Sequence, residues 1–156
     1  MSEATRIADQ LRRAFDGDAW HGDSLFEILE DVTAAQAAAR PIASAHTIWE
    51  LVLHIAAWDG AALRRIGGAA VELADAENFP PVLDGSDQAW HQATARVRST
   101  HQDLVAAVVD LPDSRIFEVV PGKQGTHYTF YYMLHGVAQH EAYHAGQIAL
   151  LKKLSQ

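Results

Sequence analysis

Apolar residues recur at intervals of three and four along most of the chain, a spacing that predicts helices rather than strands. The first long helix should end before Gly17, the second at Gly67 and Gly68, and the third before Pro112, because glycine and proline favour helix ends. Four long helices are thus expected, at residues 4–15, 47–67, 87–111 and 129–154. Shorter helical segments are expected at residues 25–29 and 33–39.

The connections between these helices complete the expected fold. The segment after the second long helix holds Asn78, Pro80, Pro81 and Gly85, which predicts a mobile loop. Residues 116–120 form a short apolar run and indicate a strand-like connector. Four long helices with connections of this length predict an all-α, antiparallel-type four-helix bundle.

Length and composition narrow the class of protein. The 156 residues suit a single domain, taken as 1–156, and 49% of them are hydrophobic. No apolar run approaches the roughly 20 residues that span a bilayer, so no membrane role is expected. The absence of cysteine and of an apolar leader predicts a cytoplasmic protein. The formal charge of −8 argues against nucleic acid as a partner, and the basic pair Arg64 and Arg65 is expected to be a solvated helix face.

Three histidines interrupt the apolar stripes. His140 and His144 are four residues apart, about 400° of helical rotation, so their rings share one face. His54 lies on the inward stripe of the second long helix. Histidines on an apolar face more often make ordinary hydrogen bonds, but polar rings inside a bundle need a partner. A metal ion is one such partner, and three imidazoles would leave it an open coordination position.

Helical rotation and rise place the other histidines away from this trio. His135 should point to the far side of the last helix, and His46 lies roughly 12 Å along the axis from His54. We expect His91 and His101 to be exposed on the third helix.

The segment from His140 to His144 also spells H-E-x-x-H, the helix motif of zinc proteases, in which Glu141 would be the general base. The extended motif requires glycine at position 147 and histidine at position 150, and this chain has Gln147 and Leu150. The sequence therefore disfavours a protease.

Five residues are candidates for roles beside the three histidines. Glu50 and Glu141 could serve as catalytic bases, although Glu50 could equally be an exposed helix carboxylate. Trp58, one turn after His54, is expected to wall a pocket. Gln147 could bond a metal ligand or a helix end, and His21 could approach the pocket mouth.

Three stretches resemble the DinB/YfiT-like superfamily of metal-dependent enzymes. They are WHGDSLFEIL from Trp20, HTIWELVLHIAAWDG from His46 and YYMLHGVAQHEAYHAGQIALLKK from Tyr131. The last is the most specific, because H-x-x-x-H is followed by Gly146, Gln147 and Ile148. The resemblance covers nearly the whole chain and implies a four-helix bundle, often paired as a homodimer.

The resemblance also implies a divalent-metal site. The family's ligand positions fall on His54, His140 and His144 of this sequence. Some members are similar to S-transferases that use a low-molecular-weight thiol, and others are called hydrolases. The expected function is therefore a metal-dependent reaction on a small molecule, by hydrolysis or by thiol transfer. Imidazole ligands suit Zn or Ni best. The alternative is a metal- or ligand-binding bundle without turnover.

Overall fold

The computed structural model describes residues 1–155, and within them the chain is helical. In chain order the helices are α1 (Glu3–Asp16), α2 (Leu25–Leu29), α3 (Ala34–Ala38), α4 (Ile48–Ile66), α5 (Asp75–Asn78), α6 (Asp87–Val109), the 3-10 turn η1 (Asp113–Arg115) and α7 (Phe130–Leu154). The expected strand-like connector at 116–120 is not a strand. In the described range its backbone makes one isolated antiparallel bridge, between Val119 and Thr129.

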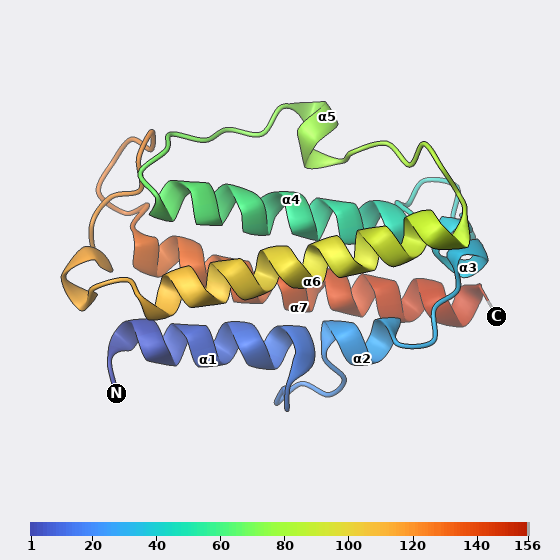
Figure 1. The fold of residues 1–156 in the computed structure, drawn as a ribbon, viewed down its shortest axis with the longest axis horizontal. Helices are drawn as coiled ribbons and strands as arrows, with labels where there is room; N and C mark the ends of the chain where they lie inside the picture. Colours follow the sequence, from blue (N-terminus) through green and yellow to red (C-terminus); the bar gives the residue numbers. More distant parts are fainter. Residues whose placement is uncertain (156) are drawn as a thin grey trace.

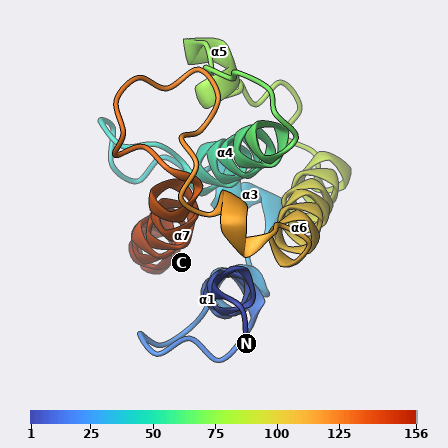
Figure 2. The same ribbon diagram turned by 90° about the vertical axis from the view of Figure 1, so that its left-hand side faces the viewer.

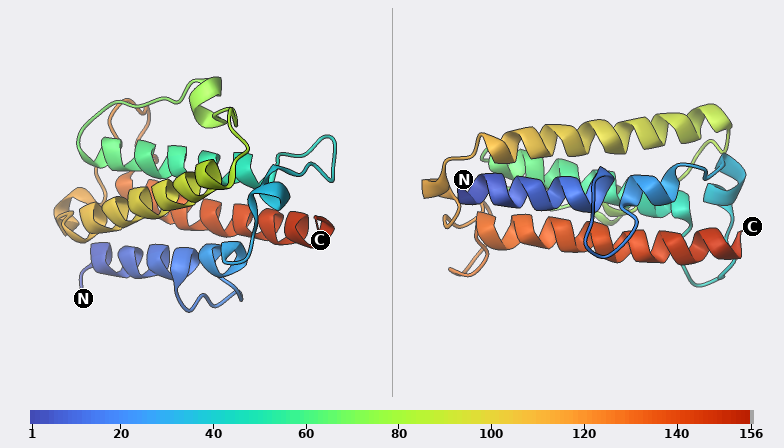
Figure 3. Two further views of the ribbon diagram at one scale, coloured as in Figure 1. Left: turned by 45° about the vertical axis from the view of Figure 1, so that its right-hand side comes forward. Right: turned by 90° about the horizontal axis from the view of Figure 1, so that it is seen from below.

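The four long helices α1, α4, α6 and α7 form a bundle (Figures 1 and 2). The short helix α2 continues the line of α1 beside α7 (Figure 3). The expected all-α four-helix bundle is confirmed.

The direction of the helices differs from the expected antiparallel arrangement. Helices α4 and α6 run the same way, and α1 and α7 run the opposite way (Figure 1). A parallel pair cannot be joined by a tight turn, so the connection from Gly67 to Ser86 must return along the whole bundle. This crossover carries α5 past α4, the helix on which the predicted metal ligand His54 lies.

The long helices begin where polar side chains cap free backbone N–H groups. The side chains of Ser2, Thr47, Ser86 and Thr129 each accept a hydrogen bond from the N–H three residues on. Such a cap is typically worth about 1 kcal/mol of helix stability. These caps place the observed helix ends within about two residues of the expected ones.

The core comprises two apolar clusters, one in each half of the bundle. Large buried members of one are Phe15, Leu25, Ile48, Ile55 and Ile148. Large buried members of the other are Ile7, Leu11, Leu104, Ile116, Phe130 and Leu134. No helix in residues 1–155 is both long enough and apolar enough to cross a membrane.

Candidate metal centre

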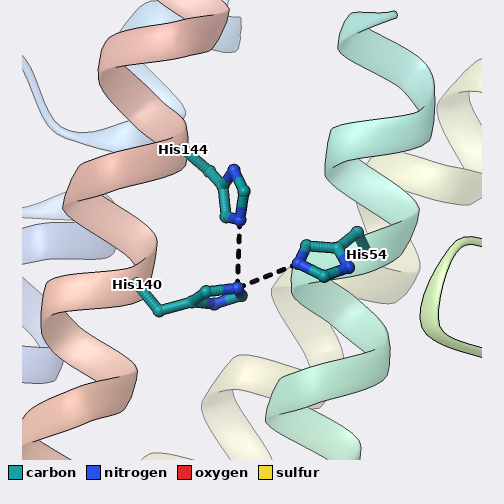
Figure 4. Close-up of side chains that lie close together, drawn as sticks. All are labelled: His54, His140 and His144. Carbon is teal, nitrogen blue, oxygen red and sulfur yellow. Dashed lines mark hydrogen bonds between the residues drawn. The ribbon is translucent and has the colours of Figure 1, made fainter. Parts of the chain in front are cut away.

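Three imidazole rings from two helices meet between α4 and α7 (Figure 4). Nε2 of His140 lies 2.9 Å from Nε2 of His54 and 3.0 Å from Nε2 of His144. The ligand atoms of the three residues all lie within 4.8 Å of one another. We call His54, His140 and His144 the histidine triad. The structure thus brings together the three residues that the sequence singled out.

The outer nitrogens of the histidine triad fix where the ring protons sit. Nδ1 of His54 lies 2.8 Å from the backbone oxygen of Asn78, and Nδ1 of His144 lies 2.6 Å from Oε1 of Gln147. Both oxygens are acceptors, so each Nδ1 carries the proton and each Nε2 presents a lone pair. Nε2 of His140 can donate to only one of these two lone pairs. A cation among the three nitrogens would remove that conflict, so the donor set fits a divalent metal ion.

The electrostatics keep these rings neutral. Burial lowers the pKa of His54 and of His144. Burial, reinforced by the proximity of the other two rings, lowers the pKa of His140 to about 3. Neutral imidazole is the form that binds metal, so at pH 7 the histidine triad is ready to act as a ligand set.

The crossover supplies one wall of the centre. Nε1 of Trp58 donates to Oδ1 of Asn78 at 2.8 Å, while the Asn78 carbonyl holds His54. The ring of Phe79 stacks on His54 with centroids 4.1 Å apart, and it also stacks on His46 at 3.8 Å. Asn78 and Phe79 were not singled out by sequence reasoning, because residues in an expected loop carry no periodic signal. The expected mobile loop is packed against the site.

A cavity of about 710 Å³ opens beside the histidine triad. His54 and His140 line one part of it, and Trp58 forms part of the wall. Its remaining lining residues are mostly aromatic or apolar: Ala62, Arg65, Asn78, Tyr128, Tyr131, Tyr132, Met133, His135, Gly136, Val137 and Gln139. A small molecule in this cavity would lie against two of the three rings.

Glu50, His21 and Glu141 neither line this cavity nor hydrogen-bond to a ring of the histidine triad, whereas Gln147 holds His144. Glu50 caps α4 through the backbone N–H of Thr47 and pairs with Arg40 and His46. Burial raises the pKa of Glu50, but those hydrogen bonds outweigh it and leave the pKa lowered. His21 is exposed and lines a separate hollow beside α1.

Glu141 is turned away from the histidine triad into a second cluster. Nδ1 of His101 lies 2.8 Å from Oε1 of Glu141 and 3.1 Å from Oδ2 of Asp59. We call Asp59, His101 and Glu141 the acid cluster. All three are buried, and the ring of Phe15 stacks on that of His101 at 3.7 Å. The expectation that His101 is exposed is wrong: it is 2% exposed, because it lies on the inward stripe of α6 between Val97 and Leu104.

The acid cluster contains a charged histidine at pH 7, whereas the three rings of the histidine triad are neutral. Burial alone would lower the pKa of His101, but Asp59 and Glu141 outweigh burial and raise the pKa to about 9. Burial raises the pKa of Glu141 to about 8 and also raises that of Asp59. The ligand atoms of the acid cluster also lie within 4.8 Å of one another. His101 therefore holds a proton at pH 7, which its ring would have to lose before it could bind a metal ion.

One of three comparisons with known proteins gives a match, and it covers the histidine triad. The comparisons with curated proteins and with solved structures found no match. A family model of the DinB superfamily matches residues 18–148, which include α4, the crossover and most of α7 with His140 and His144. Because this match covers most of the chain and the fold is the helical bundle that it implies, the chain belongs to the DinB superfamily.

Proposed function

We propose that the protein is a divalent-metal-dependent enzyme whose metal ligands are His54, His140 and His144. The observation that carries the proposal is the convergence of three Nε2 atoms that cannot all satisfy one another with protons. The adjacent cavity, which His54 and His140 line, favours an enzyme over a purely structural metal site.

The chain's residues hold and orient the ligands. Asn78 and Gln147 fix the tautomers of His54 and His144, so that each presents Nε2 to the centre. Phe79 and Trp58 shield the His54 ring from water. A divalent ion bound there would act as a Lewis acid and lower the pKa of a water molecule or a thiol in an open position.

We propose a small molecule as substrate and either hydrolysis or transfer to a low-molecular-weight thiol as the reaction. Both reactions need the same ligand set, and both need a cavity larger than one water molecule, which the structure has. Imidazole ligands favour Zn or Ni. Glu50 and Glu141 lie outside this proposal, because each is held by partners elsewhere.

Metal analysis of untagged protein tests the ligand assignment. The wild type should bind one ion per chain at micromolar concentration. The His54→Ala and His144→Ala variants should lose that binding, while His91→Ala, an exposed histidine on α6, should keep it. Unchanged binding in His54→Ala or His144→Ala would overturn the assignment.

Turnover is tested separately on the metal-loaded protein. Small thiols are screened with a shared electrophile, and esters and amides are screened for hydrolysis. Product formation that is absent in His54→Ala supports the enzyme. Tight metal binding without turnover in either screen favours the non-catalytic binding module.

We also propose that the chain forms a homodimer through the outer face of α7. Tyr143, Leu150 and Leu154 lie on that helix and are 63%, 64% and 57% exposed. Large apolar side chains that share an exposed face are typical of interfaces. Light scattering of the wild type should give twice the chain mass, and Leu150→Glu should give the monomer.

A further inference from the structure

A buried arginine lines the cavity without an acidic partner. Arg65 is 2% exposed, and no carboxylate among residues 1–155 comes within 4.0 Å of its guanidinium. Its Nε and Nη2 donate to the backbone oxygen of Val71 at 3.2 and 2.7 Å. Nη1 has only the sulfur of Met133, at 4.0 Å. The expectation that Arg65 belongs to a solvated face is therefore wrong, although its neighbour Arg64 is exposed.

The position of Arg65 at the end of α4 does not account for its burial. A cation in the last turn of a helix is stabilised by the helix dipole. Two other arginines already serve that end: Arg64 is in the same turn, and Arg115 donates to the Ile66 carbonyl at 3.4 Å. Burying a third cation with no counter-charge costs several kcal/mol. A negative charge in the cavity would offset that cost.

The cavity itself is positive in a chain that is strongly negative overall. Among its described lining residues Arg65 is the only one with a full charge, and none is an aspartate or a glutamate. The chain as a whole has a formal charge of −8. A metal ion in the histidine triad would make the cavity more positive still. His135 also lines this cavity, contrary to the expectation that it points to the far side of the last helix, and its buried Nε2 has no hydrogen-bond partner.

Trp58 links the arginine to the proposed metal centre. The guanidinium lies 5.7 Å from the centre of the Trp58 ring, and the His140 ring lies 6.2 Å from it. The cation and the histidine triad are therefore both within reach of one small molecule lying along Trp58. Three tyrosines line the same cavity: Tyr128, Tyr131 and Tyr132.

We propose that the cavity binds a molecule with a carboxylate and an apolar or aromatic body, and that Arg65 pairs with the carboxylate. The inference rests on the proposed function for the reacting end of that molecule, which faces the histidine triad. A guanidinium binds a carboxylate through two parallel hydrogen bonds, and the aromatic walls suit an apolar body. Arg65 is thus a specificity residue, and the carboxylate can belong either to the electrophile or to the thiol.

The test uses the full-length protein and a pair of probes that differ in charge. Calorimetry compares 4-phenylbutyrate with 4-phenylbutyramide on protein stripped of metal, so that the probe cannot simply coordinate an ion. The wild type should bind the carboxylate about tenfold more tightly, as expected for a charge-assisted hydrogen bond. Equal affinity for the two probes would overturn the proposal without any variant.

Matched variants assign the preference to Arg65. In Arg65→Met the two probes should bind equally, and Arg65→Lys should retain part of the preference. Arg64→Met, the exposed neighbour, should behave like the wild type. A carboxylate preference that survives in Arg65→Met overturns the proposal. If Arg65→Met fails to fold, the other two variants decide: a full preference in Arg64→Met with a reduced preference in Arg65→Lys supports the proposal, and a full preference in both overturns it.

A second pair of probes identifies which reactant carries the carboxylate. On zinc-loaded protein, 3-mercaptopropionate is compared with 3-mercaptopropionamide. If the wild type prefers the acid and Arg65→Met loses that preference, the carboxylate belongs to the thiol. If only the phenyl probes show a preference, the carboxylate belongs to the electrophile. His54→Ala separates the two proposals, because loss of metal with a retained carboxylate preference in that variant leaves the anion site standing. Metal binding by the wild type without a carboxylate preference leaves only the metal site.

Discussion

The histidine triad and the acid cluster both draw on α4 and α7, and the acid cluster also on α6, yet they differ in charge and in access. The triad is a set of neutral rings that lies beside a large cavity. The acid cluster holds a protonated imidazole between two carboxyl groups, and the Phe15 ring covers that imidazole. Both bring three possible ligand atoms within 4.8 Å of one another. Convergence of donors therefore does not by itself identify a functional site; protonation and access distinguish the two.

The difference also assigns a separate task to each cluster. Removing a partner from a closed, charged set leaves a buried charge, which costs stability. Removing a ring from an open, neutral set leaves the fold nearly unchanged and costs metal binding instead. Variants of the two clusters should therefore give opposite outcomes in stability and in metal affinity.

The largest expected effect is on the stability of the fold. Asp59→Ala should lower the free energy of unfolding by about 3–5 kcal/mol, because His101 loses a buried counter-charge. Urea denaturation followed by circular dichroism measures the change. His140→Ala in metal-free protein serves as the comparison and should cost much less; a similar loss in both would remove the distinction between the clusters.

The next effect is on metal affinity. His140→Ala should weaken zinc binding by more than about a hundredfold, since even residues that only support a ligand are worth 10–100-fold. Competition with a chromophoric chelator measures the affinity. His101→Ala should leave the affinity and the stoichiometry of one ion unchanged, and a second ion lost in that variant would show that the acid cluster also binds metal.

The acid cluster should make stability depend on pH in the alkaline range. The pKa of His101 is raised from 6.5 to about 9, so its contribution is fully present below pH 6.5 and is lost as the pH rises through 9. Each titrating group adds a slope of at most about 1.4 kcal/mol per pH unit, and Glu141, whose pKa burial raises to about 8, adds to the fall below pH 8. Unfolding in urea at several pH values should show this fall.

His101→Gln provides the control for that pH dependence. It removes the titrating ring and should reduce the slope between pH 6.5 and 9, most clearly above pH 8, where Glu141 contributes little. The histidine triad does not interfere in this window, because its pKa values are lowered below 6.5. A wild-type curve that rises through the same range would contradict the assignment of charge to the acid cluster.

The smallest effect concerns the support of one ligand. Gln147→Leu removes the acceptor for Nδ1 of His144 and should weaken zinc binding by about tenfold. The same chelator competition measures it. Gln139→Leu, another glutamine of α7 without such a contact to the triad, should have little effect on the affinity; equal losses in both would mean that the His144 tautomer is set otherwise.

Much of the fold could be predicted because caps and apolar spacing are local signals. Thr47, Ser86 and Thr129 mark helix starts that the sequence located within about two residues. The direction of α6 could not be predicted, since the length of a connection does not tell whether it turns back or crosses over. The grouping of His54 with the pair on α7 followed from helical rotation and from the family resemblance.

The acid cluster was missed although a signal existed. His101 and Asp59 each interrupt an apolar stripe, His101 between Val97 and Leu104, and Asp59 between Ile55 and Ala62. Two charged residues facing inward from neighbouring helices predict a buried pair. The burial of Arg65 had no comparable signal, because it depends on the return path of the crossover, whose Val71 carbonyl receives the guanidinium.

The acceptor that orients His54 is a main-chain carbonyl rather than a side chain. Every residue type offers the same oxygen, so substitution at position 78 would cost the Trp58 contact but not that acceptor. What must be kept is the number of residues between the end of α4 and Asn78. An insertion or deletion between Ile66 and Asn78 would shift that carbonyl away from the His54 ring and should weaken metal binding.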